Sequence, residues 1–228
     1  MGVRNSNVIN ILLEGYYINA PWLYGRLKEI IQPCHKVAVI AFSFRDTSVP
    51  SLSEWELYYG KKGRLYNGIV SGLMAYGIPE NRISFVNYFT DTKETALQKI
   101  EAAEILYFPG GLPDKTVERI DDFGLREAIV RHTGIIVGYS AGALIQLAEY
   151  HLSPDEDYPA FQYRKGLSLV DGFYLEVHYE GRNEQDASIQ RVLDERNGFV
   201  YATSLMAGAI LIHDGEIELL GNVKVFKE

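Results

Sequence analysis

The pentapeptide Gly138-Tyr-Ser-Ala-Gly142 has the residue types and spacing of a serine nucleophile held at a sharp bend between a strand and a helix. Apolar residues at 134–138 predict a buried strand before it, and residues 141–150 predict a helix after it. Glycines flanking such a bend allow crowded backbone segments to approach closely. Ser140 is therefore the candidate nucleophile, and the N–H of Ala141 at the start of the helix is a candidate oxyanion donor. The plainer interpretation is that Ser140 only caps the helix.

A Gly-Gly pair follows the apolar strand predicted at 105–108. Gly110 and Gly111 allow the backbone to turn its N–H groups inward, so Gly111 is the candidate for the second oxyanion donor. An ordinary tight turn is the alternative. No Lys-Ser/Thr follows the pair and no G-x-G-x-x-G is present, which argues against a phosphate loop.

A serine nucleophile needs a general base, usually a histidine held by a carboxylate. Among the 5 histidines, His178 ends the apolar run 172–178 and is expected at the carboxyl end of a strand, on the same edge as Ser140 if that strand is parallel. His151, directly after the predicted helix, is the second choice. His213 lies beside the predicted hairpin turn and is expected to be exposed. His35 and His132 fit turn and helix-end positions.

The carboxylate that orients the histidine is sought between Ser140 and His178 in the sequence. Asp157 is the first choice there. Asp155, Glu156 and Glu149 remain alternatives, and the acidic run 155–157 has a plainer interpretation as a solvated loop.

Strands alternate with helices through the first two thirds of the chain, which predicts an α/β domain with a mainly parallel sheet between helices. Residues 208–220 alternate around Asp214-Gly215 and predict a C-terminal β-hairpin, with one more strand at 223–226. No linker interrupts the pattern, so residues 1–228 are predicted to form one domain. Further strands are predicted at 8–13, 36–42 and 82–86, and further helices at 22–31, 65–76, 92–102 and 122–132.

Composition limits the function classes. The net charge of −8 and the lack of a basic stripe argue against a nucleic-acid partner. No apolar run is long enough for a transmembrane helix, and the beginning of the chain lacks a signal-peptide pattern. The only cysteine, Cys34, excludes an internal disulfide and a multi-cysteine metal site and fits a reducing compartment, so a cytoplasmic location is expected. With 16 tyrosines, the composition is compatible with a homodimer interface.

Four segments together resemble the peptidase E family of aspartyl dipeptidases, relatives of cyanophycinase on a class I glutamine-amidotransferase-like, flavodoxin-like fold. They are Phe108-Pro-Gly-Gly111, Gly138-Tyr-Ser-Ala-Gly-Ala143, Val177-His-Tyr179 and the predicted hairpin at 208–226. The resemblance implies a Ser–His–acid triad with Ser140 and His178, and an oxyanion hole from the N–H groups of Gly111 and Ala141. It also implies an acid in an Asp-x-Pro loop, which Asp157-Tyr-Pro159 matches.

Two segments depart from the family pattern. Leu112 replaces the polar residue after the Gly-Gly pair, and the arginine-containing stretch after the histidine aligns poorly with Glu180-Gly-Arg182. The substrate-binding candidates are therefore Gly110 and Arg182, with Arg191 as a further one. The expected activity is hydrolysis of small peptides, with Asp-X dipeptides as the implied substrates, through an acyl-enzyme and without a metal or other cofactor.

Two further functions remain open from the sequence. An α/β-hydrolase esterase would share the G-x-S-x-G pentapeptide and use His213 as its base. A small-molecule-binding protein could keep the fold without catalysis. An amidotransferase is disfavoured, because its elbow carries a cysteine and Cys34 lies far upstream.

Overall fold

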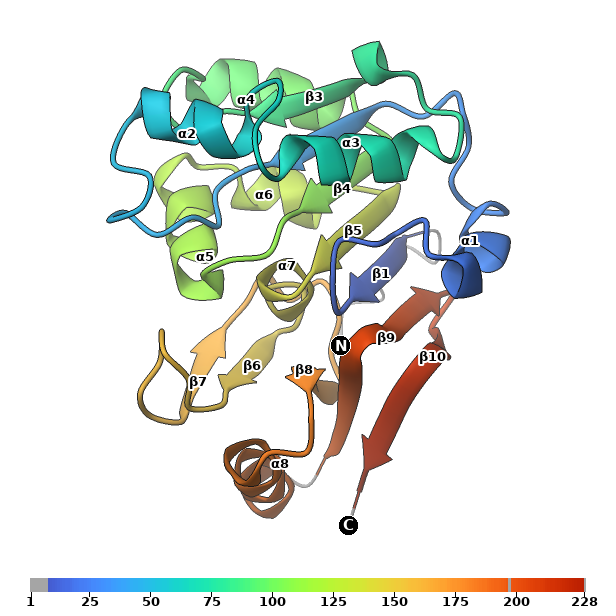
Figure 1. The fold of residues 1–228 in the computed structure, drawn as a ribbon, viewed down its shortest axis with the longest axis vertical. Coiled ribbons are helices and arrows are strands. Elements are labelled where there is room, and N and C mark those ends of the chain that lie inside the picture. The colour runs from blue at the N-terminus through green and yellow to red at the C-terminus, as the bar shows by residue number, and fades with distance from the viewer. Residues whose placement is uncertain (1–7, 197, 228) are drawn as a thin grey trace.

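The central element of the fold is an eight-stranded sheet, seen in a computed structural model that describes residues 8–196 and 198–227. The sheet has the order β10-β9-β1-β5-β4-β2-β3, and β8 pairs with β9 beside this path (Figure 1). Its parallel part consists of β1 (Ile9–Leu13), β5 (Ile135–Tyr139), β4 (Ile105–Phe108), β2 (Val37–Ile40) and β3 (Ile83–Val86). The three strands outside the parallel part are β8 (Phe173–Tyr179), β9 (Phe199–His213) and β10 (Glu216–Phe226). The α/β class and the mainly parallel sheet are thus confirmed.

Helices cover both faces of this sheet. Apolar side chains of α1 (Pro21–Leu27) and α3 (Tyr66–Met74) belong to the core on one face. The core on the other face includes side chains of α4 (Lys93–Glu101), α5 (Pro113–Asp122) and α6 (Arg126–Val130). All four residues of β2 are buried, as expected for a near-continuous apolar strand covered on both faces.

The predicted C-terminal hairpin is also confirmed. β9 (Phe199–His213) and β10 (Glu216–Phe226) pair in antiparallel fashion around Asp214 and Gly215. Both turn residues have positive φ, 53° and 80°, the conformation that a two-residue hairpin turn of the primed type requires. The hairpin is longer than predicted, because β9 begins at residue 199 and β10 takes in the strand expected at 223–226.

The prediction of a helix at 141–150 is wrong beyond the first helical turn. α7 (Ala141–Leu144) ends early, and β6 (Glu149–Leu152) pairs with β7 (Gln162–Lys165) in a separate two-stranded sheet. The carbonyl of Gln146 accepts the N–H groups of Leu169 and Val170 instead of continuing a helical ladder. Tertiary hydrogen bonds and burial therefore override a helix-forming local sequence.

Other helices also differ from the predictions, among them α1, which ends at Leu27 and not at residue 31, and α5, for which no range was predicted. The helix expected at 122–132 is shorter, and Gly124 at φ 65° separates α6 from α5. α2 (Leu52–Tyr59) and α8 (Asn183–Arg196) were not predicted. α8 has a mostly polar sequence in which only a few apolar side chains face the core, so its apolar periodicity is weak. A short 3₁₀ turn (Glu80–Arg82) precedes β3.

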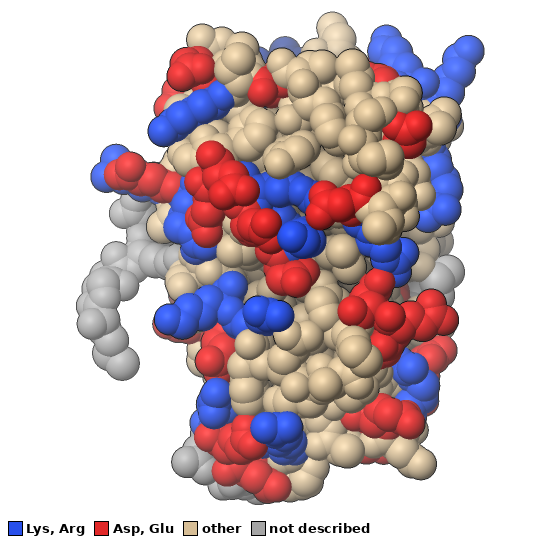
Figure 2. All heavy atoms as spheres, turned by 90° about the vertical axis from the view of Figure 1, so that its left-hand side faces the viewer, with Lys and Arg blue, Asp and Glu red and all other residues tan. Residues whose placement is uncertain are grey.

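Charges of both signs are interspersed on the face of the molecule shown in Figure 2, and no basic stripe crosses that view. Among the described residues, none of the helices is long and apolar enough to cross a membrane. In the same part of the chain, no group of three or more His, Cys, Asp or Glu side chains is arranged to hold a metal ion.

Candidate active site

Three neighbouring strands end at one edge of the sheet, and each is followed by a polar or glycine residue of the candidate site. β1 and β5 pair in parallel up to Leu13 opposite Tyr139, so Glu14 and Ser140 are the next residues on adjacent strands. β4 pairs with β5 up to Phe108 opposite Gly138, and Gly110-Gly111 follow it. Carboxyl ends of parallel strands are the usual position of sites in open α/β sheets.

Ser140 occupies a strained bend between β5 and α7. Its φ of 52° and ψ of −117° lie outside the regions that non-glycine residues usually adopt. Its N–H donates to the carbonyl of Leu13 at 2.9 Å, which fixes the bend to the neighbouring strand. A Cβ atom at Gly142 would lie 2.0 Å from the carbonyl oxygen of Phe108, so only glycine permits this close approach.

His178 is the histidine that the structure brings to Ser140, with 2.7 Å between its Nε2 and the Ser140 Oγ. It lies in β8 (Phe173–Tyr179) at a register shift and has a positive φ of 55°. The residue was predicted for a partly wrong reason, because β8 does not run parallel to β5. The first part of β9, residues 199–204, extends past the carboxyl end of β1, and β8 runs parallel to it. The carboxyl end of β8 therefore approaches the site from the opposite direction.

Glu14 provides the carboxylate that contacts His178, through a hydrogen bond between its Oε1 and Nδ1. The Glu14 side chain is only 1% exposed. A carboxylate accepts hydrogen bonds, so Nδ1 carries the proton and Nε2 is free to accept the Ser140 hydroxyl. Glu14 lies outside the segment between Ser140 and His178 in which the acid was predicted. Its position directly after the first predicted strand was the signal that could have found it, since that strand ends at the same edge as the strand before Ser140.

The expectation that Asp157 contacts His178 is not met. Both Asp157 carboxylate oxygens accept from the guanidinium of Arg45, with Nε to Oδ1 at 2.7 Å. Asp157 lies in the loop between β6 and β7, whereas Glu14 directly follows β1 and contacts His178. Asp155 accepts the N–H groups of Asp157 and Tyr158 and stabilises that turn.

Two further candidate acids lie away from the Ser140–His178 pair. Glu149 pairs with Arg196 at 2.8 Å, and Glu156 is exposed. Neither carboxylate is therefore in a position to orient the imidazole.

Two further candidate histidines are also separated from Ser140. His151 is buried and contacts Glu176 at 2.7 Å. His213 lies beyond the residue of β9 that pairs with Asn10, near the amino end of β1, so it is on the opposite edge of the sheet. This removes the geometric basis for an esterase with His213 as its base.

The Gly110-Gly111 loop lies against the bend at Ser140. A Cβ atom at Gly110 would be 3.2 Å from the Cβ of Ser140. Gly111 has φ 143°, and a Cβ there would lie 1.8 Å from the carbonyl oxygen of Ser43. Ala141 is the first residue of α7, so its N–H has no acceptor within the helix.

We expect Gly111→Ala to destabilise the protein by at least about 1–3 kcal/mol, because alanine adopts this φ only with strain and its Cβ meets the Ser43 carbonyl. Chemical denaturation measures the change. Gly25→Ala is the matched control, since that helical glycine has no atom within 4 Å of an added Cβ. The control should be neutral or stabilising by up to about 1 kcal/mol. Equal stabilities for the two variants would contradict the described loop conformation.

A pocket of about 380 Å³ opens over these residues. Ser140, His178 and Glu14 line it, and so do five tyrosines: Tyr16, Tyr17, Tyr58, Tyr59 and Tyr139. Burial raises the pKa of Tyr59 to about 12 and also raises the pKa of Tyr139, so both phenols are neutral hydrogen-bonding groups at neutral pH. The volume suits a small ligand.

Arg64 and Arg45 are the arginines that line this pocket, among the described residues. Arg45 is paired with Asp157, whereas the Arg64 guanidinium lies 5.3 Å from the centre of the Tyr58 ring and forms no ion pair within the described part of the chain. Arg182, the predicted substrate-binding arginine, pairs with Glu180 at 3.6 Å and does not line the pocket, whereas Gly110 does. Arg64 was missed because the segment 61–64 fits a solvated loop.

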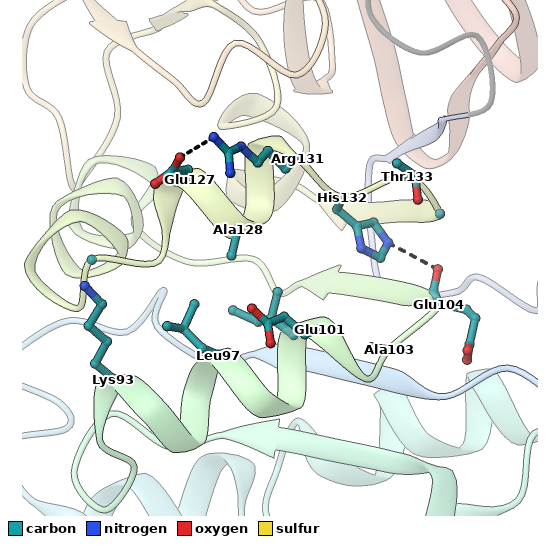
Figure 3. Close-up of a pocket in the computed structure, with 13 residues that line it drawn as sticks. Lys93, Leu97, Glu101, Ala103, Glu104, Glu127, Ala128, Arg131, His132 and Thr133 are labelled. Carbon is teal, nitrogen blue, oxygen red and sulfur yellow. Dashed lines mark hydrogen bonds and ion pairs between the residues drawn. The ribbon is translucent and has the colours of Figure 1, made fainter.

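A larger cavity, of about 540 Å³, lies at the opposite edge of the sheet between α4 and α6 (Figure 3). Its lining includes His132 and Glu104, which come shortly before β5 and β4, and His132 faces the carbonyl of Glu104. Arg131 pairs with Glu127 on its rim. None of the three residues Ser140, His178 and Glu14 borders this cavity.

A strained serine, hydrogen-bonded to a histidine that contacts a buried carboxylate at the carboxyl edge of an α/β sheet, is the side-chain arrangement of a serine-type hydrolase. The chain belongs to peptidase family S51, whose family model matches residues 72–220. This membership makes it a serine-type peptidase. The match includes Ser140, His178 and the Gly-Gly loop, but Glu14 precedes it.

Two solved structures share the fold. A provisionally assigned peptidase E from Listeria monocytogenes EGD-e superposes with a TM-score of 0.64 at 18% identity, covering 94% of this chain and 98% of that chain. A peptidase from an acI-B1 Actinobacterium gives a TM-score of 0.65 at 15% identity, covering 96% and 90%. At these identities the likeness concerns the fold. A comparison with curated proteins gave no match.

Proposed function

We propose that the protein is a dipeptidase that cleaves small peptides through a Ser140–His178–Glu14 triad and an acyl-enzyme. The observation that carries the proposal is the continuous hydrogen-bond chain from the buried Glu14 carboxylate through both ring nitrogens of His178 to the Ser140 hydroxyl. Each of the three groups has the contact that its role requires: the carboxylate holds the tautomer, the imidazole accepts a proton, and the hydroxyl becomes the nucleophile.

In the first half of the reaction, His178 takes the Ser140 proton as Oγ bonds to the substrate carbonyl carbon. The carbonyl oxygen becomes an oxyanion, and we assign its stabilisation to the N–H groups of Gly111, in the loop that lies against Ser140, and of Ala141, at the start of α7. The C–N bond then breaks, and the protonated His178 returns its proton to the departing amine. Glu14 stabilises the transient imidazolium without taking up the proton itself.

In the second half, a water molecule replaces the amine. His178 accepts a proton from that water, whose oxygen attacks the acyl-enzyme carbonyl. When the tetrahedral intermediate collapses, the bond to Ser140 Oγ breaks and His178 returns the proton to the serine. A carboxylic acid leaves and the enzyme is restored.

The substrate is expected to be a short peptide with a carboxylate close to the scissile bond, such as an Asp-X dipeptide. Two features support this. The pocket of about 380 Å³ accommodates a small molecule rather than a long extended chain. Arg64 supplies a guanidinium that forms no ion pair among the described residues, and guanidinium groups bind carboxylates through paired charge-assisted hydrogen bonds.

The test is steady-state hydrolysis of Asp-Leu, Asn-Leu and Lys-Leu, with p-nitrophenyl acetate as an ester probe. Asn-Leu replaces the side-chain carboxylate of Asp-Leu by a neutral amide of nearly the same shape. Because the Arg64 guanidinium favours a carboxylate, we expect Asp-Leu to have the highest kcat/KM. Arg64→Met should raise KM for Asp-Leu by roughly tenfold and leave KM for Asn-Leu nearly unchanged. Arg82→Met, at an arginine outside the pocket lining, is the control. Turnover of the ester without cleavage of any dipeptide would contradict the proposed function.

A further inference from the structure

The backbone that presents His178 is held in an unfavourable conformation. His178 has φ 55°, a value that costs energy for any residue other than glycine, and it lies at the register shift between Glu176 and Tyr179. This irregularity directs the imidazole to Ser140. Such a conformation persists only where surrounding groups hold it.

Gln185, in the first half of α8, is such a group. Its Nε2 donates to the His178 carbonyl at 2.9 Å and to the Glu176 carboxylate at 3.1 Å. Its Oε1 accepts the N–H of Glu180 at 2.9 Å and that of Arg182 at 3.4 Å. The residue is 1% exposed, so water does not replace these bonds. One buried amide thus connects the residues on both sides of the bend.

The orientation of this amide is determined by its partners. The His178 carbonyl and the Glu176 carboxylate only accept hydrogen bonds, and the backbone N–H of Glu180 only donates, so the Gln185 amide cannot flip without losing its bonds. The Glu176 carboxylate is fixed in turn, since it also contacts His151 and accepts from Ser153 at 2.7 Å.

Resting on the proposed function, we propose that Gln185 is a positioning residue for the general base. It stabilises the positive-φ conformation of His178 through the backbone and so keeps Nε2 within hydrogen-bonding distance of Ser140 Oγ. Gln185 does not line the pocket, so it acts on the rate of the chemical step and not on substrate binding. Its hydrogen bonds are confined to the segment that carries the histidine, which separates this role from general support of the fold.

The test compares Gln185→Met with Ile189→Ala. The first variant keeps the side-chain volume and removes every polar contact of the amide. The second truncates a buried side chain one turn further along α8 and leaves the amide in place. We expect Gln185→Met to lower kcat by roughly tenfold to a hundredfold, because small displacements of a catalytic group have effects of this size. KM should stay within about twofold. Ile189→Ala should keep kcat near the wild-type value, even though its melting temperature should be equal to or lower than that of Gln185→Met.

A second readout does not depend on turnover. In ¹⁵N-histidine-labelled protein, the Nδ1 proton of His178 bonded to Glu14 should give a downfield NMR signal that is retained in Ile189→Ala and lost or broadened in Gln185→Met. If wild type cleaves no peptide but the signals behave in this way, the proposed function fails and the positioning role stands. If Gln185→Met does not fold, Gln185→Glu removes the donors and keeps the acceptor oxygens, and the same readouts apply. Equal kcat and equal NMR signals in the two variants would overturn the inference.

Discussion

Ser140→Ala is expected to lower kcat/KM for a cleavable dipeptide by roughly 10⁴-fold or more, because it removes the hydroxyl that contacts His178 Nε2 and would form the acyl-enzyme. The fold should remain, since alanine keeps the Cβ and loses only the hydrogen bond to His178 Nε2. The residual rate measures what the oxyanion donors and the pocket contribute without a nucleophile. Stopped assays with purified protein give the rate, and thermal unfolding gives the stability.

Ser168→Ala is the matched control for this substitution. Ser168 is the other serine with positive φ in the described part of the chain, at 55°, and it is exposed and outside the pocket. Its replacement makes the same chemical change at another positive-φ position, away from the pocket, so activity should be unaffected. A comparable loss in both variants would mean that the effect is not specific to the Ser140 hydroxyl.

Glu14→Gln is expected to lower kcat by about 10² to 10⁴-fold with a smaller change in KM. The amide keeps the shape of the side chain but can present its NH₂ group to Nδ1. The histidine would then hold its proton on Nε2, where it cannot accept the Ser140 proton. The Glu14 side chain is only 1% exposed, so water cannot compensate for the negative charge that the substitution removes.

Asp157→Asn distinguishes Asp157 from Glu14 as the acid that orients His178. Asp157 contacts Arg45 at the pocket rim and not His178, so the substitution should change kcat by less than about tenfold. Any effect should be on KM, through the loop that the ion pair holds. If Asp157→Asn lost as much kcat as Glu14→Gln or more, Glu14 would not be the orienting acid.

The sequence was most informative where local pattern and chemistry coincide. The G-x-S-x-G pentapeptide placed Ser140 between β5 and the start of a helix, and the buried run 105–108 followed by two glycines placed the loop beside it. These features are local in the sequence, and the parallel sheet that brings them together can be predicted from apolar periodicity. The hairpin around Asp214 was predictable for the same reason.

Contacts that depend on pairing between segments far apart in the sequence could not be predicted in this way. His178 reaches Ser140 because β8 pairs with an extension of β9 beyond the main sheet, which no local pattern specifies. Glu14 was overlooked because the acid was sought only in the segment between serine and histidine. Arg64 lines the pocket because α2, whose apolar periodicity is weak, positions the loop that carries it.

The central claim is that Glu14 and His178 activate the Ser140 hydroxyl, and the rate of covalent labelling by a fluorophosphonate tests it most directly, with the modified residue located by peptide mass spectrometry. We predict rapid labelling at Ser140 in wild type, a decrease of about 10²-fold or more in Glu14→Gln and in His178→Ala, and nearly wild-type labelling in Asp157→Asn. Absence of an adduct on Ser140, or equal rates in wild type and Glu14→Gln, would contradict the account.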